Sequence, residues 1–469
     1  MARAAAREKP PAGALQIVLE TLSRRFGARF STAAIVREQH AHKLTWIANE
    51  PADCVVFPEN AAEVAEIVRL CAEHDVPVVA FGTGTSLEGH VNAPFGGVCV
   101  STERMSEIVA VNAEDLDAVV QPGVTRKRLN DHLRDQGLFF PIDPGADASL
   151  GGMAATRASG TNAVRYGTMR DNVLGLTAVL ASGEIIRTGG RAKKSSSGYD
   201  LTRLLVGSEG TLGIITELTL RLHGTPEAIA AGICPFLSVA AACAAATATI
   251  QSGIPVARIE LLDALQIRAC NAYSRLALPE VPTLFLEFHG SEAGVAEQSE
   301  RFGEIAADLG GGPFDWATRA EERSRLWQAR HDAFWAAGAM RPGARPMSTD
   351  VCVPISRLAE CVAETQADIA ASGLVAPVVG HVGDGNFHCL PLIDMANPAE
   401  VAACEAFVGR LVERAIAMGG ACSGEHGVGQ AKMKHLEAEH GAGAIAAMRA
   451  VKRALDPQNI MNPGKIVIP

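Results

Sequence analysis

Three histidines and one glutamate stand in two glycine-rich stretches late in the chain. The first stretch, GHVGDGNFH, runs from Gly380 to His388, and the second, SGEHG, places Glu425 beside His426. Glycine lets the backbone approach a bound group closely, so both stretches suit a compact metal site or acid–base site. The other histidines are mostly scattered singly.

A hairpin would bring two of these histidines together. Asp384-Gly385, flanked by apolar residues, is a strong signal for a two-residue turn. With the turn at this dipeptide, His381 pairs with His388 on one face, and their Cβ atoms lie roughly 5 Å apart. That separation suits two ligands of one metal ion. The alternative is a pair of cross-strand neighbours that only hydrogen-bond.

Glu425 would add a carboxylate from another loop. Two nitrogens and one oxygen leave coordination positions open, which is typical of a catalytic site, and zinc and manganese both accept such ligands. Glu425 and His426 are adjacent in sequence, so they cannot easily share one ion. If Glu425 binds the metal, His426 is free to act as a base, a role that the pKa range of histidine suits near neutral pH.

Two arginines are candidates for binding an acidic substrate. Arg330 stands in a predicted helix, LWQARH, and its guanidinium could bind a carboxylate through two hydrogen bonds. The pattern alone favours a solvated helix residue. Arg345, in the loop 341–347, is either a second substrate-binding cation or a surface residue.

Composition limits the class of protein. A chain of 469 residues needs two or more domains, and 48% hydrophobic with 20% charged residues is typical of a globular enzyme. The net charge of −10, with no Lys/Arg cluster, argues against a nucleic-acid partner.

Cysteine usage and hydropathy bear on the compartment. The 11 cysteines include no C-x-x-C pair, which predicts reduced thiols and argues against an iron–sulfur cluster. No secretory h-region and no apolar run of about 18 residues is present. We expect a cytoplasmic protein without a transmembrane span, with peripheral membrane attachment left open.

The first half of the chain reads as a β-α-β opening followed by glycine-rich loops. A strand at 54–57, a helix capped by Asn60 and a strand at 76–81 precede GTGTSLEG. This loop is not a dinucleotide fingerprint, because the third glycine is displaced to Gly89 and no helix follows. It fits either a phosphate-binding nest of backbone amides or a tight turn.

Two further small-residue segments favour a flat ligand. One runs from Pro144 to Gly160, and the other, GSEGTLGII, runs from Gly207 to Ile215. Together with the first loop, they resemble the FAD-binding domain of the vanillyl-alcohol oxidase / p-cresol methylhydroxylase (PCMH) superfamily, over roughly residues 50–222.

The resemblance implies an FAD site. The first loop would hold the pyrophosphate, and the other segments would line the rest of the cofactor. Thr85 stands where some members carry a histidine bonded to the flavin, so we expect non-covalent FAD. The residues implied to bind FAD are Phe81, Gly82, Thr83, Gly84, Thr85, Ser86, Pro144, Gly145, Ser149, Gly152, Ala158, Ser159, Gly160, Glu209, Gly210, Gly213, Ile214, Ile215 and Asn462.

The second half alternates strands and helices. Strands are expected at 228–235, 257–262, 283–288 and 314–317, with helices at 239–251, 297–309, 356–372 and 442–455. This rhythm predicts an antiparallel sheet with helices on one face. The whole chain is then α+β: a two-lobed FAD-binding domain of the PCMH type, an antiparallel, ferredoxin-like substrate or cap domain, and a C-terminal helical segment.

The expected divisions follow these changes in pattern. They are an N-terminal helical segment (1–50) ending near Trp46, an FAD-binding domain (51–224), a substrate domain (225–420), and a C-terminal segment (421–469) that carries Glu425 and His426 and returns to the FAD domain.

Several motifs of the second half resemble the FAD-linked oxidase C-terminal family. They are STDVCVPI from Ser348, the stretch 380–388, GEHG from Gly424, and DP…NPGK from Asp456. The likeness is strongest to the cytochrome-linked D-lactate dehydrogenase branch of this family. It implies that a divalent metal is bound by His381, His388 and Glu425. It also implies that His426 is the base and that Arg330 binds the substrate carboxylate.

The resemblance also implies a reaction. The expected activity is FAD-dependent oxidation of a D-2-hydroxy acid, D-lactate first, with electrons passed to a cytochrome, a quinone or an electron-transfer flavoprotein. D-2-hydroxyglutarate and glycolate are alternative substrates, and a non-catalytic flavin-binding subunit is a further alternative. A homodimer is left open. The PMST stretch from Pro346 departs from the Tyr/Lys-containing segment of the hydroxyglutarate enzymes.

Overall fold

The computed structural model describes residues 7–41, 45, 47–317 and 319–469, so Trp46 lies outside the described residues. The chain forms two compact units. The first comprises Met1–Ser159, Gly167–Thr225 and Glu425–Pro469, and the second comprises Gly160–Tyr166 and Pro226–Gly424. The divisions expected after residues 50, 224 and 420 stay predictions of domain extent.

The first unit begins with a layer of short strands and helices: α1 (Ala12–Phe26), β1 (Phe30–Ser31), α2 (Ala34–Gln39), β2 (Cys54–Val56), α3 (Ala61–Glu73), β3 (Val78–Phe81) and β4 (Val98–Ser101). The strand order is β1-β2-β4-β3, with β2, β4 and β3 parallel. Asn60 caps α3 by accepting the Glu63 amide, as its sequence predicted. The opening is therefore the expected β-α-β unit.

A second layer of the first unit is an antiparallel sheet in the order β5-β6-β10-β8-β9. Its burial alternates along β10, where Leu218 and Leu220 are buried and Glu217 and Thr219 are partly exposed, as expected for a sheet with one apolar face. Its strands are β5 (Ile108–Asn112), β6 (Asp117–Val120), β8 (Val173–Val179), β9 (Ile185–Gly189) and β10 (Ile214–Arg221).

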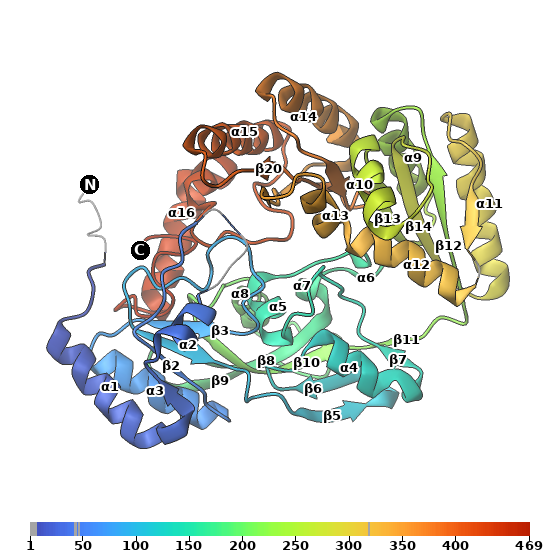
Figure 1. Cartoon of the computed structure of the whole chain (residues 1–469). Helices are drawn as coiled ribbons and strands as arrows, with labels where there is room; N and C mark the ends of the chain where they lie inside the picture. Colours follow the sequence, from blue (N-terminus) through green and yellow to red (C-terminus); the bar gives the residue numbers. More distant parts are fainter. Residues whose placement is uncertain (1–6, 42–44, 46, 318) are drawn as a thin grey trace. The chain divides into compact units, whose positions relative to one another are not determined.

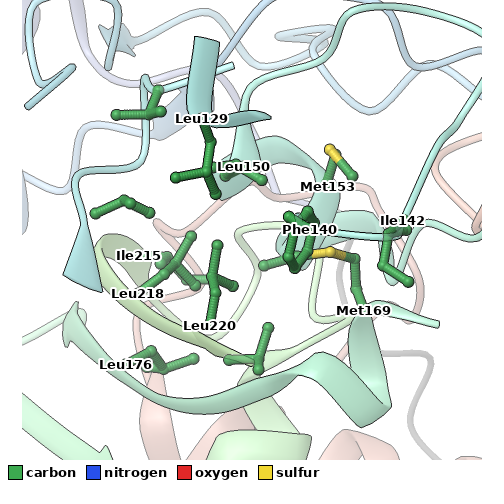
Figure 2. Close-up of a cluster of buried hydrophobic side chains, with 14 of the residues drawn as sticks. Leu129, Phe140, Ile142, Leu150, Met153, Met169, Leu176, Ile215, Leu218 and Leu220 are labelled. Atoms are coloured by element: carbon green, nitrogen blue, oxygen red, sulfur yellow. The ribbon is translucent and has the colours of Figure 1, made fainter. Parts of the chain in front are cut away.

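Short helices and a two-stranded pair complete the packing of this sheet: α4 (Arg126–Leu133), β7 (Leu138–Phe139), α5 (Leu150–Thr156), α7 (Met169–Asn172), α8 (Leu201–Leu205) and β11 (His223–Gly224). Figure 2 shows the resulting core, in which Phe140 and Met169 lie beside Leu218 and Leu220. This core fixes α5, which follows directly after Ser149.

The end of the chain belongs to the first unit. Helix α16 (Leu436–Leu455) is interrupted at Gly441, whose φ of 80° is not helical, so the continuous part begins where the sequence predicted. Beyond it, Met461 forms a parallel bridge with Val78. The segment 456–465 is thus tied to the strand that leads into the Gly82 loop.

The second unit is built on an antiparallel sheet in the order β15-β12-β14-β13-β18-β19-β17. Figure 1 labels three of its neighbouring strands, β12, β14 and β13. The strands predicted at 228–235, 257–262, 283–288 and 314–317 correspond to β12, β13, β14 and β15. The strands are β12 (Ala228–Pro235), β13 (Val256–Leu262), β14 (Thr283–Gly290), β15 (Asp315–Ala317), β17 (Val351–Cys352), β18 (Val378–Gly380) and β19 (Asn386–Cys389), with a separate pair formed by β16 (Arg345–Pro346) and β20 (Leu392–Ile393).

Helices cover both faces of this sheet, so the expectation of helices on one face is wrong. Phe285 and Phe288 on β14 point to opposite faces; Phe285 contacts Trp327 of α12, and Phe288 contacts Phe302 of α11. The helices are α6 (Ala163–Tyr166), α9 (Val239–Gln251), α10 (Ala264–Ser274), α11 (Glu292–Asp308), α12 (Ala320–His331), α13 (Ala333–Ala339), α14 (Leu358–Ser372) and α15 (Pro398–Ala417).

Among the described residues, none of the helices combines the length and the apolar character needed to cross a membrane.

Candidate active site

His381 and His388 lie at the end of the β18–β19 hairpin in the second unit. The predicted register, with His381 opposite His388, is wrong, because His388 pairs with Val379. The predicted two-residue turn is also wrong: Asp384 N and Asn386 N both approach the carbonyl oxygen of His381, at 3.0 and 3.3 Å, so His381 already belongs to the loop.

Pairing with other strands explains the shifted register. Strand β18 also pairs with β13, where Gly380 stands opposite Leu261, and β19 pairs with β17, where Phe387 stands opposite Val351. These ladders outweigh the local turn preference of the Asp-Gly dipeptide. The two imidazoles nevertheless stay together, with ring centroids 5.4 Å apart and planes at 85°.

Both imidazoles are oriented through Nδ1. His388 Nδ1 lies 2.8 Å from the carbonyl oxygen of Thr349, which can only accept a hydrogen bond. His381 Nδ1 lies 2.7 Å from Oε1 of Glu260. The hydrogen-bond network therefore assigns the proton to Nδ1 and the lone pair to Nε2 in each neutral ring. This tautomer, held by a carbonyl or carboxylate, is the one that metal-binding histidines adopt.

The chain before Glu425 is held against the strands that carry the histidines. Asp350 accepts hydrogen bonds from Asn386 Nδ2 and Ser423 Oγ, both at 2.8 Å. Gly424 packs so closely that a Cβ there would lie 2.1 Å from Asn386 Nδ2. Only glycine fits at position 424, the residue that directly precedes Glu425.

The three predicted ligands come together. One ligand atom from each of His381, His388 and Glu425 lies within 4.8 Å of the other two. Two imidazole nitrogens and one carboxylate oxygen are a donor set that zinc and manganese accept. The residues therefore fit a divalent metal, and the metal itself stays a prediction.

Arg330 is buried rather than solvated. Its Nε and Nη2 donate to Oε2 of Glu260 at 2.9 and 2.6 Å, and its Nη1 takes no part in this ion pair. Burial alone would raise the pKa of the Glu260 carboxyl, but His381 and Arg330 outweigh burial and hold the pKa below its ordinary value. Arg345, by contrast, is exposed on β16.

The predicted FAD loops pack against each other within the first unit. A Cβ at Gly82 would lie 2.2 Å from Ser149 Oγ, and Ser149 N donates to Thr83 Oγ1 at 3.3 Å. Ser149 Oγ and Ser208 Oγ are buried without a hydrogen-bond partner among the described residues. Because buried hydroxyls normally have partners, these two fit loops that receive a polar cofactor.

Other predicted FAD residues have structural contacts of their own. Ile214 and Ile215 pack into two different hydrophobic clusters, so only their backbone could face a cofactor. Asn462 Nδ2 donates to the carbonyl oxygens of Glu209 and His90, at 2.7 and 3.0 Å. These contacts hold the loop around Gly210 in place.

Glu209 binds the segment that carries the predicted base. Its carboxylate accepts the amides of Val428 and Gly429 at 2.7 and 2.8 Å. Burial alone would raise the pKa of the Glu209 carboxyl, but His90, whose Nε2 lies 3.3 Å away, and the two amides hold it below its ordinary value. This charged residue therefore anchors the loop after His426.

His426 itself faces a carboxylate. Its Nδ1 lies 3.4 Å from Oε1 of Glu88, which is also 3.4 Å from Lys432 Nζ. The backbone carbonyl of Glu88 accepts the amides of Gln430 and Ala431. A carboxylate at Nδ1 favours the tautomer with the lone pair on Nε2, the arrangement that a histidine base needs.

Sequence reasoning missed Glu260, Asp350 and Glu88. Glu260 offered one signal, because it is a single acidic residue within the apolar strand VARIELL. A charge in the middle of a buried strand requires a partner. Its partners are 70 and 121 residues away, so the pattern could indicate a buried ion pair but not identify it.

Comparison with known proteins identifies the family of the chain. The C-terminal domain of FAD-linked oxidases matches residues 225–466, and an FAD-binding domain matches residues 52–189. The chain belongs to the FAD-linked oxidase family. Within this family, it is 52% identical to "Probable D-lactate dehydrogenase, mitochondrial" of Danio rerio, over 93% of this chain and 88% of the relative.

Two further comparisons bear on relatives and fold. The chain is 48% identical to "D-lactate dehydrogenase [cytochrome], mitochondrial" of Arabidopsis thaliana, over 89% of this chain and 74% of the relative. The crystal structure of p-cresol methylhydroxylase superposes with a TM-score of 0.81 over 98% of both chains at 19% identity. This likeness confirms the predicted α+β fold with a PCMH-type FAD-binding domain.

Proposed function

We propose that this FAD-linked oxidase oxidises the D-2-hydroxy acid D-lactate to its 2-oxo acid. The FAD that accepts the electrons is proposed to be bound non-covalently. The names of its relatives support the substrate. The observation that carries the chemistry is the donor set of His381, His388 and Glu425, because a simple flavin carrier has no need of a metal site. Bound FAD supplies a two-electron acceptor for the hydrogen on the substrate Cα.

His381, His388 and Glu425 would hold one zinc or manganese ion. A divalent ion held there would supply a Lewis acid that lowers the pKa of the substrate hydroxyl. The contribution of the chain is to fix both imidazoles through Glu260 and Thr349, so that Nε2 of each is the donor atom. The metal and its identity remain part of this proposal.

His426 is proposed to accept the hydroxyl proton at Nε2. Glu88 holds Nδ1 as the protonated nitrogen and would stabilise the imidazolium that forms. Arg330 is proposed to orient the substrate carboxylate through the part of its guanidinium that does not face Glu260. Correct orientation of the reacting groups can account for much of the rate gain.

We propose a separate carrier, such as a cytochrome, a quinone or an electron-transfer flavoprotein, as the final acceptor of the electrons that bound FAD would supply. The word "cytochrome" in the name of the Arabidopsis relative supports a protein carrier. Steady-state assays with each carrier class as the sole acceptor would distinguish them.

The first test is anaerobic bleaching of the flavin by single substrates. D-lactate should reduce the FAD rapidly, and L-lactate, D-2-hydroxyglutarate and glycolate should reduce it much more slowly. Faster reduction by D-2-hydroxyglutarate or glycolate would change the substrate. No reduction by any 2-hydroxy acid would favour a non-catalytic flavin-binding subunit.

The second test addresses the base. His426→Ala should bind FAD normally and lose about 10²–10⁴-fold in the rate of flavin reduction, the usual contribution of a general base. A normal reduction rate in the FAD-loaded variant would refute this role for His426.

A further inference from the structure

Glu260 occupies the centre of β13, where its side chain is completely buried. On the same face of the sheet, its register partner is Phe285, and α12 packs over that face through Trp327. A carboxylate in such a place is costly unless both oxygens have strong partners. Its partners therefore indicate why a charge is kept there.

Each oxygen of Glu260 has a different partner. Oε1 accepts from Nδ1 of His381 at 2.7 Å, and Oε2 accepts from Nε and Nη2 of Arg330 at 2.9 and 2.6 Å. One carboxylate thus joins a proposed metal ligand to the proposed substrate-binding arginine. All three residues belong to the second unit.

We propose that Glu260 is a positioning residue that sets the ligating tautomer of His381 and the orientation of Arg330 at the same time. This inference rests on the proposed function. A carboxylate can accept on both oxygens, so it satisfies the imidazole N–H and the guanidinium together. No neutral side chain of the same shape can do both.

The substitution Glu260→Gln exposes this requirement. Glutamine has one accepting oxygen and one donating amide. The oxygen will turn to Arg330, because the guanidinium is charged and cannot accept, and the amide will then face Nδ1 of His381. That nitrogen must become the acceptor, so the proton moves to Nε2 and His381 loses its ligating tautomer.

The experiment measures metal affinity on FAD-loaded protein, by competition with a chelating indicator for added Zn²⁺ or Mn²⁺. Glu260→Gln should weaken metal binding by about 10–100-fold, the range for groups that orient metal ligands. The double variant Glu260→Gln/Arg330→Met should recover affinity to within about threefold of Arg330→Met alone, because the glutamine oxygen can return to His381. Recovery on removing a second residue is a result that simple structural damage would not give.

Glu287→Gln is the matched control. Glu287 is a buried carboxylate on the adjacent strand β14, and it pairs with Arg258 and His289 instead. Its substitution changes the charge of the same sheet but should leave metal affinity unchanged. The thermal unfolding of all variants is measured alongside. The double variant has no unpaired buried charge, so it keeps the test valid if Glu260→Gln folds poorly.

The possible results distinguish a failure of the proposed metal site from a failure of the proposed role of Glu260. If the unsubstituted protein binds neither metal, the metal part of the proposed function fails. If it binds metal and Glu260→Gln binds equally well, or if Glu287→Gln weakens binding as much as Glu260→Gln, the role of Glu260 is overturned.

Discussion

The buried carboxyl of Asp263 should make the stability of the protein depend on pH. It is almost fully buried and caps α10 by accepting the amide of Gln266 at 2.8 Å. Burial raises the pKa of its carboxyl from 3.8 to about 6, against hydrogen bonds that lower it. The native state therefore keeps this proton to a higher pH than the unfolded chain does.

The sign and size of the effect follow from proton linkage. Between about pH 4 and 6, the native state binds more protons, so the free energy of unfolding falls as pH rises through that window and levels off above it. A difference of about two pKa units corresponds to about 3 kcal/mol. Asp263→Asn keeps the cap without the charge, so it should match the unsubstituted protein near pH 4 and be more stable by up to about 3 kcal/mol at pH 7.

The assay is urea unfolding at a series of pH values, followed by tryptophan fluorescence. Trp316, Trp327 and Trp335 make up three of the four tryptophans and lie in the second unit, so the signal reports mainly on the unit that holds Asp263. Subtracting the two pH profiles cancels the contributions of distant carboxylates. A stability difference that does not change between pH 4 and 7 would show that burial does not raise the pKa of Asp263 in the native state.

Two other substitutions test separate parts of the structure. Lys452→Met removes an ammonium that donates to Thr211 O, Met461 O and the buried Asp456 carboxylate, so it should cost about 3–5 kcal/mol of stability. Because segment 456–462 leads to Asn462, the affinity for FAD, measured by flavin fluorescence, should fall as well. A loss of stability under about 1 kcal/mol would count against this anchor. His388→Ala removes a proposed ligand and should weaken Zn²⁺ or Mn²⁺ binding by more than about 100-fold while FAD stays bound, whereas metal binding unchanged from the parent would exclude His388 as a ligand.

Local patterns predicted much of the fold. Strand 228–235 and helix 239–251 were identified to the residue, and the amphipathic pattern of α3 and its Asn60 cap were also confirmed. These elements have boundaries marked by capping residues or prolines and apolar periods that neighbouring elements do not alter. The arrangement of helices on both faces of the sheet was not predicted, because periodicity tells which side of a helix is buried but not which face of the sheet it covers.

The sequence predicted the residues of the candidate site, but it did not predict the strand register or the ion pair that position them. The glycine-rich setting indicated His381 and His388, but the register of their hairpin depends on β13 and β17, which lie far away in sequence. Arg330 was expected to be solvated on its pattern alone, and only the structure places it against Glu260. A buried carboxylate in the middle of an apolar strand is the signal that could have indicated such a partner.

The proposed function requires a metal held by His381, His388 and Glu425 for the oxidation of D-lactate. The most direct measurement is the anaerobic rate of flavin reduction by D-lactate in FAD-loaded protein that has been stripped of metal with a chelator and then reconstituted. The stripped protein should keep its FAD but reduce it far more slowly, and one equivalent of Zn²⁺ or Mn²⁺ should restore the rate. Equally fast reduction in the stripped protein, with metal analysis confirming that no ion remains, would exclude a role for the metal in the reaction.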